Sequence, residues 1–293
     1  MALQMLSKTN EKRLMISLSM KTSRNFTWVG GPTFLLHIGS FRLLSDPMLA
    51  KGPVAFYMNG HPTTGEDNAP ITRAAPLPHV DIQPLDLVLI THLHSDHFDS
   101  AARKTLPKDS FLIAPADQID SPKLSTFTRR RALGWWQEIL LEKNGEALRI
   151  TALPARHSHH PLTNEELGTV NGYALQYSTA GNTYTIYWTG DTVWFEEIRE
   201  IKERLGEVDL LVPHMGAVGK DGPWGLMTLD SEEAAKVVEV MQPRLIIPIH
   251  YHTFSHYTEP IYLLEEKLQH DAAKLQVLVE GQTIALPETK LQP

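Results

Sequence analysis

Short apolar runs in this chain lead repeatedly into side chains that can bind metal. The run Leu87–Ile90 leads directly into "THLHSDHFD", residues 91–99, which holds three histidines and two aspartates. Apolar runs of this length are typical of buried strands, and functional side chains collect in the loops where strands end. The same arrangement recurs before four further residues: His157, Asp191, His214 and His250. We therefore expect a sheet-based fold with a polar site at the ends of its strands.

Strand and helix patterns alternate along most of the chain. Antiparallel strands are predicted across residues 26–47, where Gly-containing turns separate apolar stretches. Further strands are predicted at residues 85–91, 110–115, 135–142, 147–155, 172–178, 184–190, 244–250 and 275–286. Helices are predicted at residues 100–107, 121–134, 194–206, 232–241 and 259–270. Strand-rich halves that each end in helices predict an α/β (α+β) fold, with two sheets packed together and helices outside.

Three segments carry further predictions. Residues 48–84 are rich in Pro and Gly and are predicted to be irregular. Their run Phe56–Met58 forms either an apolar wall over a pocket or the packing of a surface loop on its own domain. The run Arg129–Arg131 is placed at the solvated end of the predicted helix 121–134. Residues 1–24 are predicted to be a basic N-terminal arm, and residues 25–288 a single domain.

Composition limits the partners. The 293 residues include no cysteine and carry a formal net charge of -7. Thiolate metal sites and a cysteine nucleophile are thus excluded, and an acidic surface does not attract phosphate backbones, so no nucleic acid partner is expected. No run approaches the roughly 18 apolar residues of a membrane-spanning helix, and the N-terminus lacks the apolar core of a signal peptide. We expect a cytoplasmic protein with a small-molecule substrate.

The spacing within the motif indicates metal binding. Side chains two apart on an extended chain point the same way, so His92 and His94 can bind one ion. Asp96 and His97 lie just past the strand end, where the chain can turn toward a second ion. Imidazole and carboxylate suit zinc, iron or manganese. The predicted first site is His92, His94 and His157, the second is Asp96, His97 and His250, and Asp191 bridges them.

These motifs resemble those of the metallo-β-lactamase-fold hydrolases. "THLHSDHFD" is similar to the His-x-His-x-Asp-His signature, and "TGDT" and "PIHY" are similar to the motifs around Asp191 and His250. "LLSDP" resembles an early motif whose aspartate, here Asp46, supports the metal centre by contacting its ligands. The branch with N-acyl phosphatidylethanolamine phospholipase D and the ascorbate-6-phosphate lactonases looks most similar. The resemblance implies an αββα sandwich with metals at one edge of the sheets, and relatives make a homo-oligomer plausible.

The ligand set predicts a reaction. Two divalent ions, expected to be Zn²⁺ with Mn²⁺ or Fe²⁺ as alternatives, lower the pKa of water from about 15.7 towards 7. The hydroxide would cleave an ester, lactone, amide or phosphodiester bond of a small-molecule or lipid-like substrate. Asp96 would orient it and carry its proton. His214 and His256 are candidate catalytic residues, and His256 is preferred over His252. His214 would either donate a hydrogen bond to the substrate or hold a metal ligand in place.

Several alternatives stay open at this point. His159 competes with His157 as a ligand, because both lie in "HSHH". An iron-dependent oxygenase is a second function for the same ligands, although the complete second site argues against a single-iron enzyme. A nuclease is a third function, and the net charge argues against it. A non-catalytic metal-binding protein is the fourth.

Overall fold

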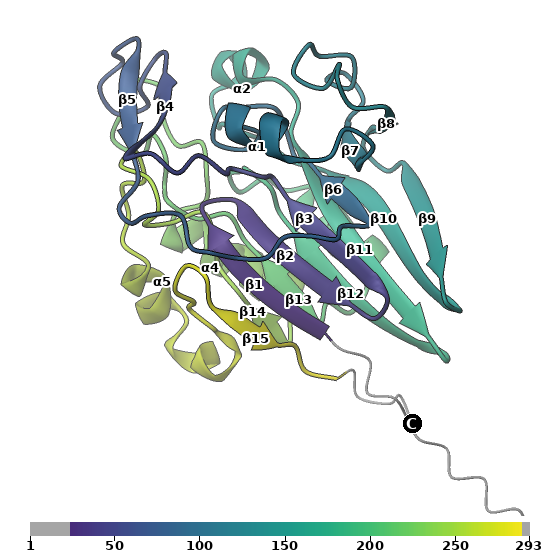
Figure 1. Ribbon diagram of the computed structural model, residues 1–293. Helices are drawn as coiled ribbons and strands as arrows, with labels where there is room; N and C mark the ends of the chain where they lie inside the picture. Colours follow the sequence, from purple (N-terminus) through teal and green to yellow (C-terminus); the bar gives the residue numbers. More distant parts are fainter. Residues whose placement is uncertain (1–23, 289–293) are drawn as a thin grey trace, which may run out of the picture.

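The antiparallel strands expected at the start of the chain are present and form part of the larger of two sheets (Figure 1). The computed structural model describes residues 24–288. The arm predicted at residues 1–24 therefore lies outside the described residues, apart from Arg24, which begins the first strand. In spatial order, the larger sheet consists of β15 (Thr283–Ala285), β1 (Arg24–Gly30), β2 (Thr33–Ile38), β3 (Phe41–Ser45), β6 (Leu87–Leu89), β7 (Phe111–Pro115) and β8 (Arg129–Leu133).

The second sheet has six strands and is also mixed. Its spatial order is β14 (Leu245–Ile246), β13 (Leu210–Val212), β12 (Asn182–Trp188), β11 (Asn171–Thr179), β10 (Glu146–Pro154) and β9 (Glu138–Lys143). The strands β12, β13 and β14 pair in parallel, as do β3, β6, β7 and β8 in the first sheet. Parallel strands need long crossovers, and the connections in this chain carry the helices and the site loops.

Side-chain alternation explains why both faces of the first sheet are buried. Leu87 and Leu89 belong to the large core shared with the second sheet, whereas Val88 and Ile90 belong to a separate cluster on the opposite face. Helix α1 (Ser100–Thr105) covers that opposite face with Ala102. Strands that are buried on both faces read as continuous apolar runs, which is the pattern the sequence shows before its motif.

Helices cover the other side of the second sheet. The helices α3 (Ile198–Leu205), α4 (Ser231–Met241) and α5 (Tyr262–Lys267) pack their apolar residues into the large core, and the short 3-10 helix η1 (Gln269–Lys274) follows α5. Asp230 caps α4, because its side chain accepts a hydrogen bond from the backbone N–H of Glu233 at 2.9 Å. The predicted layering of helix, sheet, sheet and helix is confirmed.

Hydrogen bonds also tie the two sheets together beside the motif. The Tyr173 hydroxyl on β11 donates to the carbonyl of Ile90 at 2.8 Å. The backbone N–H of Asn171 donates to the carbonyl of Thr91 at 3.0 Å. Tyr173 and Asn171 are fully buried, so these bonds fix the second sheet against the end of β6.

Two local predictions were wrong. The helix predicted at residues 121–134 is absent, and Arg129–Arg131 instead begins the edge strand β8, which pairs with β7 over five residues. Pairing with a neighbouring strand outweighed local helix propensity there, and exposed arginines are suited to an edge strand because they discourage further pairing. Residues 48–84 are not wholly irregular, because β4 (Val54–Met58) and β5 (Ala69–Thr72) form a hairpin.

The remaining boundaries differ in length from those predicted. The last strand, β15, is shorter than the strand predicted at residues 275–286. The helix predicted at residues 259–270 is divided between α5 and η1. Helix α2 (Pro161–Leu167) was not predicted, although a proline at its first position is a common helix start. Within residues 24–288, every helix is too short or too polar to cross a lipid bilayer.

Candidate metal centre

The motif forms the connection between β6 and α1. Thr91 anchors its beginning, because its backbone N–H and its hydroxyl donate to the two carboxylate oxygens of Asp46 at 2.7 and 2.6 Å. The chain then turns, and the backbone N–H of His97 donates to the carbonyl of His94 at 3.1 Å. Asp99 ends the loop by capping α1. The turn lets this segment of nine residues present four candidate ligands at one place.

The three histidines of the predicted first site face one another. His94 Nδ1 lies 2.9 Å from His92 Nε2 and 3.3 Å from His157 Nε2. His94 Nε2 contacts the Leu167 carbonyl at 3.0 Å, and His157 Nδ1 contacts the Met227 carbonyl at 2.9 Å. A carbonyl only accepts, so these outer nitrogens carry the protons and the lone pairs point inward. Inward lone pairs at this range repel one another unless a cation lies among them, so this group fits a metal ion.

The histidines of the predicted second site are oriented in the same way, with the outer ring nitrogen on an oxygen and the inner one toward the centre. His97 Nδ1 lies 2.8 Å from Asp46, and His250 Nδ1 lies 3.1 Å from the carbonyl of Met215. The inner nitrogens of both rings approach Asp96 Oδ2, at 3.7 Å for His97 and 3.6 Å for His250. His250 Nε2 is buried and has no hydrogen-bond partner. A buried nitrogen without a partner is costly, and a metal ion would satisfy it.

Asp191 lies between the two groups. Its Oδ2 is 3.7 Å from His157 Nε2 and 4.0 Å from His92 Nε2. The same oxygen is 3.2 Å from His97 Nε2, and Oδ1 is 3.6 Å from His250 Nε2. One carboxylate therefore contacts side chains of both groups, as the predicted bridging role requires.

His214 lies beside the second group but uses both ring nitrogens in other contacts. It falls with His97, Asp191 and His250 in a set whose ligand atoms all lie within 4.8 Å of one another. Trp188 Nε1 donates to His214 Nε2 at 2.7 Å, and an indole N–H only donates. The proton of His214 is therefore on Nδ1, which donates to Asp191 Oδ1 at 2.7 Å. With no lone pair left for a metal, His214 orients Asp191.

Burial and neighbouring charges shift the pKa values of His94 and His97 in opposite directions. Burial, together with the neighbouring His157, lowers the pKa of His94 to about 4. Burial also favours neutral His97, but the carboxylates of Asp191 and Asp96 outweigh this and hold the pKa of His97 well above 6.5. In return, the histidines hold the pKa of Asp191 and of Asp96 well below 3.8, against the opposing effect of burial. Both carboxylates are ionised at neutral pH.

The loop after His250 contributes one further histidine to the site. His256 Nε2 lies 3.6 Å from Asp96 Oδ2, and its buried Nδ1 has no hydrogen-bond partner. Its ring packs between Phe56 and Phe254, with ring centroids 5.7 and 6.0 Å away. His252, by contrast, is exposed.

Gly31 fixes the backbone of this loop. Its carbonyl accepts from the backbone N–H of His250 at 2.9 Å, and its own N–H donates to Thr253 Oγ1 at 2.7 Å. Its φ of +53° is in the left-handed region, and a Cβ added there would lie 2.7 Å from the ring of Phe254. A glycine is needed at this position because both the backbone conformation and the space exclude a side chain.

His159 lies apart from the centre. Its side chain is about half exposed and its Nε2 contacts Glu233 Oε1 at 2.5 Å on the surface. His157, two residues earlier, is the histidine that joins His92 and His94. The structure therefore places His157, and not the competing His159, with the first group.

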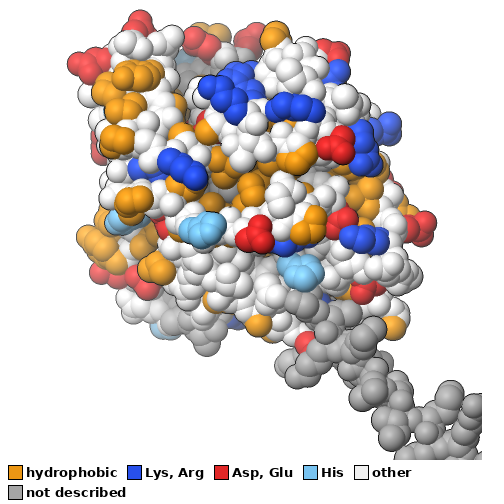
Figure 2. Space-filling model, viewed as in Figure 1, with side chains coloured by type: hydrophobic (Ala, Val, Ile, Leu, Met, Phe, Trp, Pro, Cys, Tyr) orange, Lys and Arg blue, Asp and Glu red, His pale blue; other side chains and the backbone are white. Residues whose placement is uncertain are grey.

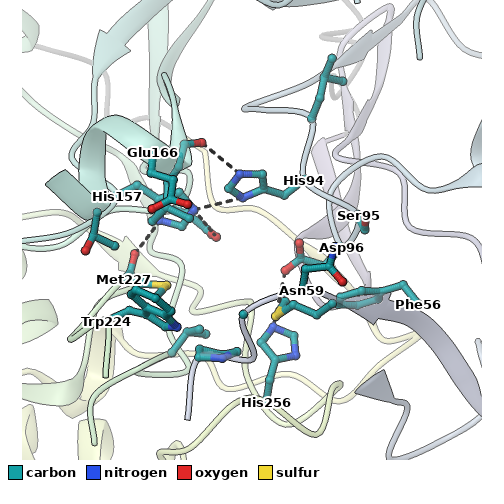
Figure 3. Close-up of a pocket in the computed structure, with 18 of the residues that line it drawn as sticks. Phe56, Asn59, His94, Ser95, Asp96, His157, Glu166, Trp224, Met227 and His256 are labelled. Atoms are coloured by element: carbon teal, nitrogen blue, oxygen red, sulfur yellow. Dashed lines mark hydrogen bonds and ion pairs between the residues drawn. The ribbon is translucent and has the colours of Figure 1, made fainter. Parts of the chain in front are cut away.

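A pocket of about 380 Å³ opens onto the two groups (Figure 3). Figure 3 shows Phe56 and Trp224 on opposite sides of it, with His94 and Asp96 between. The run Phe56–Met58 on β4 lines the pocket, so the segment 48–84 does supply an apolar wall. In Figure 2, hydrophobic side chains gather at the upper left, over this hairpin, where Val54 and Tyr57 are exposed.

Two charged residues at the pocket were not predicted. Lys123 lies between β7 and β8, and Glu166 lies on α2. Neither belongs to a motif, and Lys123 lay within the helix wrongly predicted at residues 121–134. Only the packing of these segments around the metal ligands brings them to the site, so no local sequence pattern could have identified them.

Comparison with known proteins agrees with this geometry. Residues 63–251 match the family model described as a Beta-lactamase superfamily domain. The chain is 28% identical to a metal-dependent hydrolase of Pyrococcus furiosus, covering 89% of this chain and 98% of the relative. It is 26% identical to N-acyl-phosphatidylethanolamine-hydrolyzing phospholipase D 1 of Caenorhabditis elegans, covering 81% and 66%. An isothiocyanate hydrolase from Delia radicum gut bacteria has the same fold, with a TM-score of 0.75 at 23% identity, covering 89% and 98%.

The matched segment includes the motif loop, His157, Asp191, His214 and His250. It also spans the strands whose ends hold these side chains, from β6 to β14. The metal-binding geometry and the family match therefore concern the same part of the chain. This chain belongs to the metallo-β-lactamase superfamily and is a metal-dependent hydrolase.

Proposed function

We propose that the chain holds two divalent ions and hydrolyses an ester, lactone, amide or phosphodiester bond in a small-molecule or lipid-like substrate. The observation that supports this most is the position of Asp191, whose two oxygens face both histidine groups. The first ion would be held by His92, His94 and His157, and the second by Asp96, His97 and His250. Zn²⁺ suits imidazole and carboxylate ligands, with Mn²⁺ or Fe²⁺ as alternatives.

The bound ions would supply a hydroxide at neutral pH and polarise the attacked group. The protein's own part in the reaction begins with Asp96, which is ionised and lies on the pocket wall. Its carboxylate can orient the nucleophile and accept its proton. His256 Nε2, 3.6 Å from that carboxylate, can exchange a proton with it and so assist proton transfer to the leaving group.

Other residues of the site would orient a metal ligand or shape the substrate pocket. His214 holds Asp191 in one orientation, because its ring is itself fixed by Trp188. Phe56 and Trp224, on opposite sides of the pocket, would accommodate an apolar part of the substrate and limit access of water to the reacting group. Similarity to a phospholipase of the same family supports a lipid-like substrate. A cytoplasmic location and self-association stay predictions.

Metal analysis and a substrate panel test this proposal. Tag-free protein is expected to hold about two metals per chain by mass spectrometry, and Asp191→Ala is expected to lose one or both. Asp209→Ala is the matched control, because Asp209 is equally buried but pairs with Arg244 away from the site. Turnover of nitrophenyl esters, lactones and phosphodiesters should follow metal content. Wild-type protein that binds no metal after incubation with zinc or manganese would refute the proposal.

A further inference from the structure

Lys123 is a lysine without a carboxylate partner in the pocket wall. It is the sole Lys or Arg among the described residues that line the pocket, and it is half-buried. Among residues 24–288, no carboxylate oxygen lies within 4.0 Å of its Nζ to form an ion pair, whereas the exposed Lys220 pairs with both Asp230 and Glu259. Asp96 attracts the ammonium group only from beyond ion-pair distance, and a partly desolvated charge with no direct ion pair is unfavourable.

The nearby backbone accounts for only part of its bonding capacity. Lys123 Nζ donates to the carbonyl of Leu93 at 2.5 Å, and Leu93 stands between the ligands His92 and His94. An ammonium group has three donors, and no other acceptor contacts this one in the part of the chain described. The contact holds the ammonium group at the pocket wall and leaves two donors for another partner.

The Lys123 segment is itself firmly held. Gln118 accepts from the backbone N–H of Leu93 at 2.8 Å and donates to the carbonyl of Thr169 at 2.6 Å. Leu124 is fully buried in the core cluster beneath α1. The position of the lysine is thus set before any ligand binds, and a preformed cation binds an anion at a lower entropic cost than a mobile one.

We propose that Lys123 forms a subsite for an oxyanion of the substrate, a carboxylate or a phosphate group, next to the bond that is cleaved. This inference rests on the proposed function, because it places the anion beside the same metal centre. Asp96 and Lys123 both line the pocket, and so do the apolar side chains of Phe56 and Trp224. The predicted substrate therefore carries an apolar part and an anionic part.

Calorimetric titration of the metal-loaded protein tests this subsite with three probes of one shape class. Phenylacetate carries a carboxylate, phenylphosphonate carries a phosphate-like group, and phenylacetamide is neutral. Lys123→Met is expected to weaken binding of at least one anion by about tenfold or more, because a charge-assisted hydrogen bond is lost, and to leave phenylacetamide within twofold. Lys123→Arg should retain most of the anion affinity. A larger loss for phenylphosphonate than for phenylacetate would assign a phosphate group, and the reverse a carboxylate.

Two controls separate this role from a structural one. Lys108 also donates to a backbone carbonyl, that of Leu106 at 3.3 Å, but it lies outside the pocket. The control variant Lys108→Met should therefore leave anion binding unchanged. Metal content is measured in each variant. Equal weakening of all three probes, unchanged anion affinity, or loss of metal from Lys123→Met would overturn the subsite. Binding does not require turnover, so these results stand even where no panel substrate is hydrolysed.

Discussion

Replacing Asp46 by Asn tests how the second ion would be held. Asp46 is fully buried and its carboxylate accepts from His97 Nδ1 at 2.8 Å and twice from Thr91. These contacts keep the proton of His97 on Nδ1 and its Nε2 directed at the centre. An asparagine has no charge, and its NH₂ group would face either the Thr91 N–H, donor against donor, or His97, which would then need its proton on Nε2.

The magnitude follows from the bond that is lost. A hydrogen bond to a charged group contributes about 1.5–3 kcal/mol, which corresponds to roughly 10- to 150-fold in affinity. Replacing a residue that orients a metal ligand typically lowers metal affinity about 10–100-fold. We therefore expect Asp46→Asn to weaken the second ion about 10–100-fold. The first ion should change by about threefold or less, because Leu167 and Met227 orient two of its ligands.

The assay is competition for Zn²⁺ with a chromophoric chelator, which resolves the two binding steps. Asp86→Asn is the matched control. The Asp86 carboxylate also accepts a hydrogen bond from a backbone N–H, that of Arg42 at 2.8 Å, beside the same sheet but away from the site. Circular dichroism confirms that both variants are folded. If Asp46→Asn binds the second ion as tightly as the Asp86 control does, the orienting role of Asp46 is wrong.

Three further predictions concern the same centre. The pKa of His97 is held well above 6.5, whereas that of His94 is lowered to about 4, so a metal must displace a proton from His97 but not from His94. Lowering the pH from about 8 to about 5 should therefore release the second ion first, and simultaneous loss of both ions in metal analysis contradicts this. His214→Ala should keep the first ion but lower turnover about 10–100-fold, and turnover within twofold of wild type would end that role. Gly31→Ala should cost about 2–4 kcal/mol in urea unfolding and Gly145→Ala about 1 kcal/mol, because both have positive φ but only the first Cβ meets an aromatic ring; equal losses would contradict the steric argument.

Much of the centre was predictable because its residues follow recognisable strands. The apolar runs before His92, His157, Asp191 and His250 identified the strand ends, and the close spacing within the motif indicated more ligands than one ion needs. The structure brings these side chains together. The sequence could not indicate the hydrogen-bond partner of the outer ring nitrogen of each histidine. Several of these partners are backbone carbonyls, such as that of Met227, whose positions are set by tertiary packing.

The features that the sequence did not indicate have one physical cause. The β8 segment pairs with a strand whose position depends on the whole sheet, so its arginine run gave no local sign of a strand. Lys123 reaches the pocket because the segment between β7 and β8 packs on the motif loop. His214 was placed near the site by its apolar run, but its protonation depends on Trp188 across a parallel strand pair. Each depends on contacts between residues distant in sequence, which propensity and periodicity do not encode.

Of the seven candidate ligands, four follow a strand of one sheet and three follow strands of the other. His92, His94, Asp96 and His97 follow β6, whereas His157, Asp191 and His250 follow strands of the second sheet. Neither set can assemble the centre alone, so we expect high metal affinity only after the sheets have docked. A nascent or misfolded chain would thus be kept from generating a reactive hydroxide. Metal content would in turn report on folding: a substitution at Tyr173, which joins the sheets through Ile90, should lower it without touching any ligand.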